Sequence, residues 1–459
     1  MNKNILTYAA KSSLVEQNYY SPTAVLPITG VPISTVFCFL AHPDPWSDDA
    51  NPDQPTQDQK YIKSVYKNIF ALKQISSTDI APIIKRVDWI TGKTYNYYRD
   101  DIDMFELDGD GNPTQNFYIR NNYDQVFKCL WNNNDQPSTM MPFFQPGTYG
   151  TNNIFKGSDG YKWKYLYTID SRSKKTFMDK NWIPVIIGEN IAGPVFDNNG
   201  NQTGAFAGDV EVINVIHGGS GYNTITSPIT VTITGDGTGA AAYAEVVNGI
   251  ITDIVVTNPG TNYTYVNVTI TSSTGSGAVA IAPISPIGGH GFDPESELGT
   301  NHSMFTCEFK GSEGGYVPTD IEYHQVGLII NPLSSTSYPN PAAASIYNAA
   351  TQLITAPGFG NFVSDEILYQ GDSLETATFT ATVLSFDSNT NTISLINITG
   401  TPKLNASVFG NSTSTVRTLL SVSSPEILLP SGYLSYIENR SAVQRSADGI
   451  EQFKFVLGY

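Results

Sequence analysis

A short segment of alternating acidic and small residues, Asp108–Asn112 (DGDGN), could converge oxygen atoms on a calcium ion. The glycine spacing differs from that of an EF-hand, Pro113 follows at once, and Ile119 stands where a bidentate Glu would be needed. Asp and Gly are also residues that turns prefer. We therefore expect a hairpin turn between residues 104–107 and 117–119, without a metal.

Two glycine-rich motifs would suit nucleophilic or phosphate chemistry if their surroundings agreed. Gly218–Tyr222 (GGSGY) begins like the turn that presents a catalytic serine, but Tyr222 replaces the final Gly, and no strand–turn–helix pattern surrounds it. Gly235–Gly239 (GDGTG) lacks both the GxGxxG spacing and the lysine of a phosphate loop. Both motifs are predicted to connect strands.

Neighbouring carboxylates at Asp100–Asp101 and Asp365–Glu366 could act as a general acid and base if they converged on one bond. Adjacent residues on a strand point to opposite faces, so these pairs are predicted to lie at solvated edges or in turns. We expect no catalytic residue and no cofactor, and hence no enzyme.

His290 is the histidine whose surroundings best suit a ligand, because the glycines of Gly288–Asp293 (GGHGFD) let the backbone approach closely and Asp293 could orient the ring. The remaining histidines show no ligand spacing to it; they are His42, His217, His302 and His324. A structural turn or an interface contact is the expected role of His290.

The composition argues against nucleic acid as a partner. The formal net charge is −17, and residues 173–175 are the one short cluster of basic side chains. A phosphate backbone would be repelled. Only 15% of the residues are charged, whereas Gly, Pro and Tyr are abundant, which is typical of a β-rich protein with large protein-covered surfaces.

The three cysteines, Cys38, Cys129 and Cys307, are far apart in apolar surroundings and are predicted to be buried free thiols in a reducing compartment. No apolar run reaches the ~18 residues that a membrane span requires. We expect a protein that is made and used without crossing or inserting into a membrane.

Local patterns predict several elements. Val36–Leu40 is a buried strand, and residues 58–72 have apolar side chains at helical spacing. In Gly160–Tyr167 the aromatic residues alternate with Lys and Leu, which predicts a strand with one aromatic face.

The middle of the chain contains an internal repeat in which Gly turns separate β-branched runs. The first copy, 218–222, 229–234 and 237–240, is echoed by 259–263, 266–271 and 275–278. We expect two similar β units side by side. Asn248-Gly249 between the copies predicts a two-residue hairpin.

We predict a mainly β, multidomain fold with an α+β core. Residues 1–190, 287–337 and 425–459 would form this discontinuous core, because helical and strand patterns mix there. Two inserted all-β domains would occupy 191–286, the repeat, and 338–424, a small barrel or sandwich.

Several segments resemble, in the same order, the baseplate wedge proteins of T4-like contractile-tailed bacteriophages, and among them the subunit that sits as a dimer in the outer part of each wedge. They are 44–46, 77–80, 84–89, 92–98, 124–131, 159–167, 182–185, 284–294, 297–299, 325–332, 431–440 and 451–455.

The resemblance implies a structural virion protein of the tail baseplate that is assembled in the host cytoplasm. It would form a homodimer, dock on other wedge proteins and take part in rearrangement on infection. By analogy, Trp163, Tyr165, Trp182 and Pro184 would support the core, and Tyr436, Glu438, Asn439 and Arg440 would form a structured segment near an interface. Arg440 could bind a carboxylate in a bidentate manner.

Two alternatives remain from the residues. A receptor- or glycan-binding tail protein would use the Thr, Asn and Tyr surfaces of the inserted β domains. A polysaccharide-cleaving enzyme would need two convergent carboxylates, which no spacing in the sequence indicates.

Overall fold

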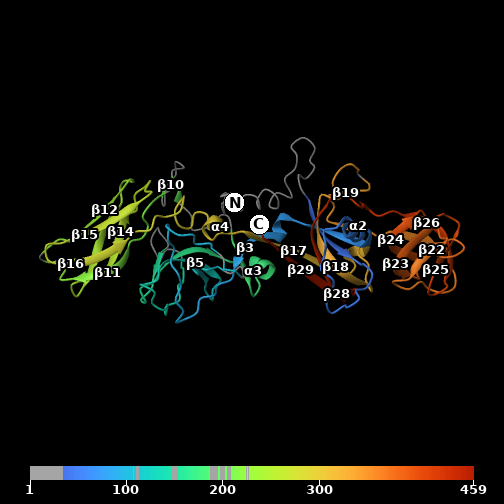
Figure 1. Ribbon diagram of the computed structural model, residues 1–459, viewed down its shortest axis with the longest axis horizontal. Helices are drawn as coiled ribbons and strands as arrows, with labels where there is room; N and C mark the ends of the chain where they lie inside the picture. The colour runs from blue at the N-terminus through green and yellow to red at the C-terminus, as the bar shows by residue number, and fades with distance from the viewer. Residues whose placement is uncertain are drawn as a thin grey trace. The chain divides into compact units, whose positions relative to one another are not determined.

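The computed structural model describes residues 35–106, 108–109, 113–145, 154–186, 195–196, 202–203, 208–223, 225, 227–336 and 338–458. They form two compact units. Unit 1 contains Ala81–Met304, and unit 2 contains residues 35–80 and Phe305–Val456 (Figure 1). Strands predominate in both, in several sheets and one closed barrel, which confirms the predicted mainly β, multidomain fold.

The ranges expected to form one discontinuous core are distributed over both units. The chain passes from unit 2 to unit 1 at Ile80–Ala81 and returns at Met304–Phe305. These crossings lie within β3 (Ile80–Lys85) and β17 (His302–Lys310). The domain boundaries stated above therefore stay a prediction.

Unit 1 contains an antiparallel sheet in the order β4-β5-β7-β6. Its strands are β4 (Tyr118–Arg120), β5 (Gln125–Trp131), β7 (Lys162–Thr168) and β6 (Ile154–Lys156). Both faces of the central strands β5 and β7 are buried. One face contains an aromatic cluster formed by Tyr95, Ile119, Phe127, Cys129, Phe155, Tyr161, Trp163 and Tyr165.

The expected single aromatic face is interrupted by a β-bulge at Leu166. Tyr165 is opposite Phe127, but Tyr167 is opposite Val126, so Leu166 has no partner across the strand pair. An extra residue in one strand reverses the alternation beyond it. Tyr167 consequently packs on the other face, with Leu166 and Val126.

Unit 1 also contains smaller elements. β3 pairs with β8 (Trp182–Pro184). The helices are α3 (Ser171–Phe177), whose first turn is capped by Asp170, and α4 (Pro294–Glu297), capped by Asp293. A two-stranded pair joins β9 (Val195–Phe196) to β10 (Gln202–Thr203).

The internal repeat folds as one interleaved module instead of two units side by side. Each pair joins a strand of the first copy to one of the second: β11 (Asn214–Ser220) with β16 (Ser276–Ile281), β12 (Thr230–Gly235) with β15 (Val266–Thr271), and β13 (Ala241–Val247) with β14 (Ile250–Asn258). Figure 1 shows these strands grouped together in green to yellow. With β11, β12 and β13 in the first copy and β14, β15 and β16 in the second, the pairing is symmetric between the two copies.

Two buried tyrosines also connect the two copies. The Tyr222 hydroxyl accepts a hydrogen bond from the Ala278 amide at 3.2 Å, and the Tyr263 hydroxyl accepts one from the Ala240 amide at 3.3 Å. Each bond joins one copy to the other, so neither copy completes its own core. The predicted hairpin at Asn248-Gly249 is confirmed, with positive φ at both residues.

Unit 2 contains a five-stranded antiparallel sheet in the order β20-β2-β1-β18-β28. The strands are β20 (Ile346–Asn348), β2 (Ile69–Ile75), β1 (Val36–Ala41), β18 (Glu322–Ile330) and β28 (Tyr433–Gln444). Helix α2 (Gln59–Asn68) packs on this sheet through Val65 and Tyr61.

The helix predicted over residues 58–72 is shorter than expected. Asp58 caps its first turn, but Ile69 is already extended and begins β2. The apolar run Ile69–Leu72 fits a buried strand as well as a helix, and pairing with β1 decides between them.

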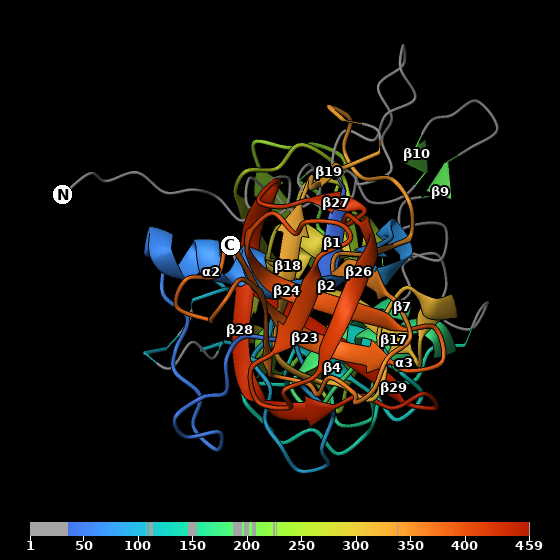
Figure 2. The same cartoon turned by 90° about the vertical axis from the view of Figure 1, so that its right-hand side faces the viewer.

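The second insert contains a closed six-stranded barrel in the order β21-β24-β23-β22-β25-β26. Its strands are β21 (Thr351–Thr355), β22 (Ile367–Gln370), β23 (Phe379–Asp387), β24 (Thr392–Gly400), β25 (Ser407–Gly410) and β26 (Val416–Ser423). Figure 2 shows the barrel facing the viewer, in orange to red. Inward-facing apolar side chains such as Leu353, Val383 and Leu395 fill it.

The remaining elements are short connections and one long strand. They are η2 (Ser77–Asp79), η3 (Glu313–Gly315), β19 (Leu333–Ser334), which pairs with β27 (Ile427–Leu428), and β29 (Ile450–Gly458).

Candidate functional site

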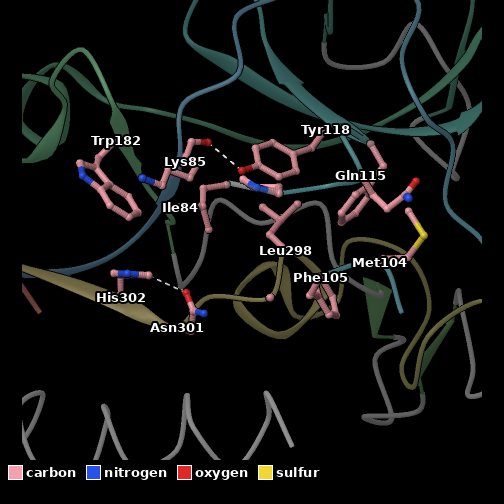
Figure 3. Close-up of a pocket in the computed structure, with 13 residues that line it drawn as sticks. Ile84, Lys85, Met104, Phe105, Gln115, Tyr118, Trp182, Leu298, Asn301 and His302 are labelled. Atoms are coloured by element: carbon pink, nitrogen blue, oxygen red, sulfur yellow. Dashed lines mark hydrogen bonds between the residues drawn. The ribbon is translucent and has the colours of Figure 1, made fainter. Parts of the chain in front are cut away.

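A small pocket in unit 1 lies beside Trp182, a residue that the sequence singled out. Its volume is about 50 Å³, and Trp182 lines it. Figure 3 shows Trp182 and His302 on one side and Met104 and Phe105 on the other. The lining residues are Ile84, Lys85, Met104, Phe105, Pro113, Gln115, Phe117, Tyr118, Trp182, Leu298, Gly299, Asn301 and His302.

The rim of this pocket combines a cation with aromatic rings. The Lys85 ammonium lies 4.2 Å from the centre of the Trp182 ring, and the His302 ring centre lies 4.6 Å from that of Trp182. Burial and the nearby Lys85 lower the pKa of His302, so its ring is neutral at pH 7. The Tyr118 hydroxyl donates to the Lys85 carbonyl at 2.7 Å and fixes this strand end.

The pocket is too small for a cofactor. For comparison, an apolar cavity of roughly 150 Å³ holds a single benzene ring. About 50 Å³ with apolar walls suits the tip of one aliphatic side chain from a partner protein, which is how anchor residues enter interfaces.

Trp163 and Tyr165 lie elsewhere, in the aromatic face of the β5–β7 sheet. Trp163 is fully buried, stacked on Tyr161 with ring centres 5.4 Å apart and edge-on to Tyr95 at 5.6 Å. Pro184 is buried in β8, and its carbonyl accepts a hydrogen bond from Tyr167 at 3.0 Å. Trp163, Tyr165 and Pro184 lie at packed positions, and of the four proposed core residues Trp182 lines the pocket.

The opposite face of the same sheet contains buried lysines that the sequence did not mark as important. Lys128 and Lys164 are neighbours across the β5–β7 pair. Lys128 binds Glu297 at 2.8 Å, and Lys164 binds Glu211 at 2.8 Å, with all four side chains almost entirely buried. We call these four residues and His290 the buried ionic network. It joins the sheet to α4 and to the segment that precedes β11.

Further lysines attach the repeat module to the sheet. Lys162 binds the Asp253 carboxylate at 2.9 Å and the Ile213 carbonyl at 2.8 Å. Lys156 binds the other oxygen of Asp253 at 2.5 Å. Asp253 lies in β14, so one carboxylate connects the centre of the module to β6 and β7.

His290 lies inside the buried ionic network. Its backbone N–H donates to Glu211 at 2.6 Å, and its ring meets the Tyr98 ring edge-on at 4.8 Å. Neither ring nitrogen forms a hydrogen bond with a described residue, and Nδ1 is 3.8 Å from the Glu297 carboxylate. The structure therefore places His290 in a packed turn.

The sequence suggested that Asp293 could orient the His290 ring, but the structure shows that it does not. Its carboxylate accepts from the Ser296 N–H and caps α4, whereas its own N–H donates to Glu297. The side chain is therefore engaged by the helix that follows it.

The protonation of the network follows from its contacts. Burial alone would raise the pKa of Glu297, but Lys128 and His290 outweigh burial and hold it at about 2. Burial and the Lys128 charge lower the pKa of His290. Burial lowers the pKa of Lys128, and the Glu297 charge opposes that shift. At neutral pH the network thus contains ionised carboxylates and a neutral histidine.

In unit 2 the segment Tyr436–Arg440 lies in the edge strand β28. The Asn439 side chain accepts from Tyr61 at 2.8 Å and from Gln325 at 2.5 Å, and donates to the Asp53 carbonyl at 2.7 Å. Asn439 therefore joins α2, β18 and the preceding loop to the sheet edge.

The other proposed residues of this segment pack on β29. The Tyr436 ring lies 5.4 Å from that of Phe455, and its hydroxyl is 3.4 Å from Glu438. The bidentate pair suggested for Arg440 is absent among the described residues. Arg440 makes one 3.3 Å contact with Glu438 and covers the Phe453 ring at 5.4 Å, because β29 offers an aromatic surface there.

The residues from Asp108 to Asn112 lie largely outside the described part of the chain, so the turn predicted there is not seen. Among the described residues, no cluster of three or more His, Cys, Asp or Glu side chains could hold a metal ion. None of the helices in the described ranges combines the length and the apolar character that a bilayer crossing requires. All three cysteines are buried and free.

No protein-family model matches the chain, and no curated protein matches it.

Proposed function

We propose that the chain is a structural subunit of the baseplate wedge of a contractile phage tail. It docks on neighbouring wedge proteins, forms a homodimer within each wedge, and takes part in baseplate assembly and rearrangement on infection. Its place would be the tail baseplate of the virion, after assembly in the host cytoplasm.

One observation carries the proposal: separated segments of the resemblance meet in one packed site. Lys128 and Lys164 belong to two of these segments and are neighbours in the sheet, and Glu297 of a third binds Lys128. Chance similarities scattered over the sequence would have no reason to converge. Their convergence supports a shared architecture.

A second feature fits a docking function. The pocket beside Trp182 is preformed, apolar and of a size for one side chain, with Lys85 and His302 at its rim. Small buried pockets of this kind receive the anchor residues of protein partners.

The proposal is tested by purifying the tagged chain from cells in which the phage tail is being assembled. We expect baseplate proteins to co-purify and a cryo-EM map of the tail to contain this fold in its baseplate. A complete tail plate without the chain would contradict the proposal. Binding to host envelope glycans without any co-purifying tail protein would favour the receptor-binding alternative.

Arg440 offers a specific test of the β28 segment. Its side chain is one-third exposed, so Arg440→Ala should change the free energy of unfolding by less than about 1 kcal/mol. We expect it to weaken co-assembly with wedge proteins severalfold, measured by pull-down of purified components. Arg99→Ala, which removes an exposed pair with Asp101, is the matched control. Unchanged assembly of the Arg440 variant would remove this assignment.

A further inference from the structure

Two buried histidines and an aspartate lie where the barrel meets the five-stranded sheet of unit 2. His42, at the end of β1, is almost fully buried. Its Nδ1 is 2.7 Å from the Glu322 carbonyl oxygen, and its Nε2 is 2.5 Å from the Asp365 carboxylate. Asp365 precedes β22, so this contact joins the barrel to the sheet.

The two partners determine the protonation of His42. A carbonyl oxygen only accepts hydrogen bonds, so Nδ1 carries a proton. An ionised carboxylate also only accepts, so Nε2 carries another. His42 is therefore an imidazolium cation paired with Asp365. Burial is the largest single influence and would lower its pKa, but the hydrogen bond and charge of Asp365, together with Glu322, outweigh burial and raise the pKa.

The surrounding charges leave His42 as the cation of this site. The His324 ring lies 5.0 Å away and edge-on, and burial together with the His42 charge lowers its pKa. The Glu322 carboxylate is 3.6 Å from His324 Nε2, and the charges of Glu322 and Asp49 oppose this lowering of the His324 pKa. Asp365 is half-exposed, and His42 lowers its pKa.

The barrel is also held by packing of β24 against α2 and by a neck, the pair of segments through which the chain enters and leaves it. Its entering and leaving segments run side by side, where the Glu426 N–H donates to the Asn348 carbonyl at 3.0 Å and the Asn348 N–H donates to the Glu426 carboxylate at 2.9 Å. A groove of about 710 Å³ lies between barrel residues, including Ser364 next to Asp365, and the loop 312–320. The barrel thus has open space beside the His42 contact.

We propose that the His42–Asp365 ion pair is a latch that fastens the barrel to the five-stranded sheet, and that loss of the His42 proton loosens the barrel segment that precedes β22 from the sheet. The inference does not depend on the proposed function. It adds to the covalent neck and the β24–α2 packing an electrostatic contact that can open.

The direction in which pH opens the latch follows from the raised pKa of His42 and the lowered pKa of Asp365. His42 has a raised pKa, so the latch is fully formed below the ordinary value of 6.5 and is lost as pH rises through the shifted pKa. Asp365 has a lowered pKa, so its contribution is present above the ordinary value of 3.8 and is lost in stronger acid. Alkaline conditions should therefore open the latch first.

The test compares the full chain with Asp365→Asn. Asp365 has a φ of 68°, a conformation that Asn also tolerates, so the variant removes the charge without backbone strain. NMR titration of the histidine rings should give His42 a pKa above 6.5 in the native chain and at least one unit lower in the variant. A native His42 that titrates at or below 6.5 would overturn the proposal.

Hydrogen exchange measures the opening itself. At pH 6, we expect backbone amides around residues 363–367 to exchange roughly three- to tenfold faster in Asp365→Asn than in the native chain. At pH 9 the two should exchange alike. Asp372→Asn, another exposed barrel aspartate, should match the native chain at both pH values. Equal exchange of Asp365→Asn and the native chain at pH 6 would rule out a latch.

Discussion

Replacing Lys128 by alanine is expected to lower the free energy of unfolding of unit 1 by about 3–5 kcal/mol. The Lys128 side chain has no solvent exposure, and Glu297, its partner at 2.8 Å, is 3% exposed. Without Lys128 the Glu297 carboxylate would remain buried and ionised with its main compensating charge removed. The Lys128 ammonium also lies 4.1 Å from the centre of the Tyr98 ring, and that contact would be lost too.

Urea denaturation followed by near-ultraviolet circular dichroism measures this loss. Because two compact units unfold within one chain, the transition of unit 1 has to be identified separately, for example by hydrogen exchange of β5 and β7. The double variant Lys128→Met with Glu297→Gln removes both charges and keeps the hydrogen-bond acceptor for the Gly291 N–H. It should recover most of the lost stability, because a neutral pair of similar volume avoids the uncompensated charge.

The pH dependence gives an independent check. In the native chain the pKa of Glu297 is held at about 2, below its ordinary value of 4.5, so its contribution to stability is present above pH 4.5 and is lost in stronger acid. In Lys128→Ala the buried carboxyl should instead have a raised pKa, and its penalty should shrink as pH falls from 7 to 4. A constant difference between native and variant chains over this range would contradict the role assigned to Lys128.

The two faces of the β5–β7 sheet show how far the sequence could predict the core. Alternation of aromatic residues with lysines predicted strand β7 and a packed face with Trp163. The same alternation left Lys162 and Lys164 without an evident partner, because Asp253 and Glu211 are distant in the sequence. Buried charges become recognisable only when the fold brings their partners to them.

Local irregularities of the strands and helices also could not be predicted from the sequence patterns. Period-two alternation cannot reveal the bulge at Leu166, which depends on the register of two strands and moves Tyr167 to the other face. Similarly, the run after Asn68 fits a helix or a buried strand until β1 pairs with it. The strand pairs of the repeat module depend on contacts between copies that the repeat itself does not encode.

The pocket beside Trp182 was missed for a related reason. Its walls come from β3, the segment before β4, β4, β8 and the segment from the end of α4 to the start of β17, and most of the residues they contribute are ordinary apolar ones. Only Trp182 had been singled out, by the family resemblance. In the repeat module and the barrel, by contrast, turn residues and β-branched runs occur next to each other in the sequence, so the β character of both inserts could be predicted.

Replacing Trp163 by alanine is the second change for which a large effect is expected, a loss of about 3–5 kcal/mol in the stability of unit 1. The indole has no solvent exposure and contacts Tyr161 and Tyr95 in the aromatic face. Its Nε1 forms no hydrogen bond with a described residue, so the loss comes from the cavity and the missing ring contacts. Trp163→Phe should therefore retain most of the stability.

Trp182→Ala provides the matched comparison in the same unit. Trp182 is only partly buried, at the pocket rim, and its ring covers Lys85 and His302 rather than filling the core. In the same urea titration, we expect Trp182→Ala to lower the free energy of unfolding clearly less than Trp163→Ala does. We also expect it to weaken the binding of a partner side chain in the pocket. Equal losses for the two alanine variants would show that the rim carries as much packing energy as the aromatic face, and the division between core support and docking surface would fail.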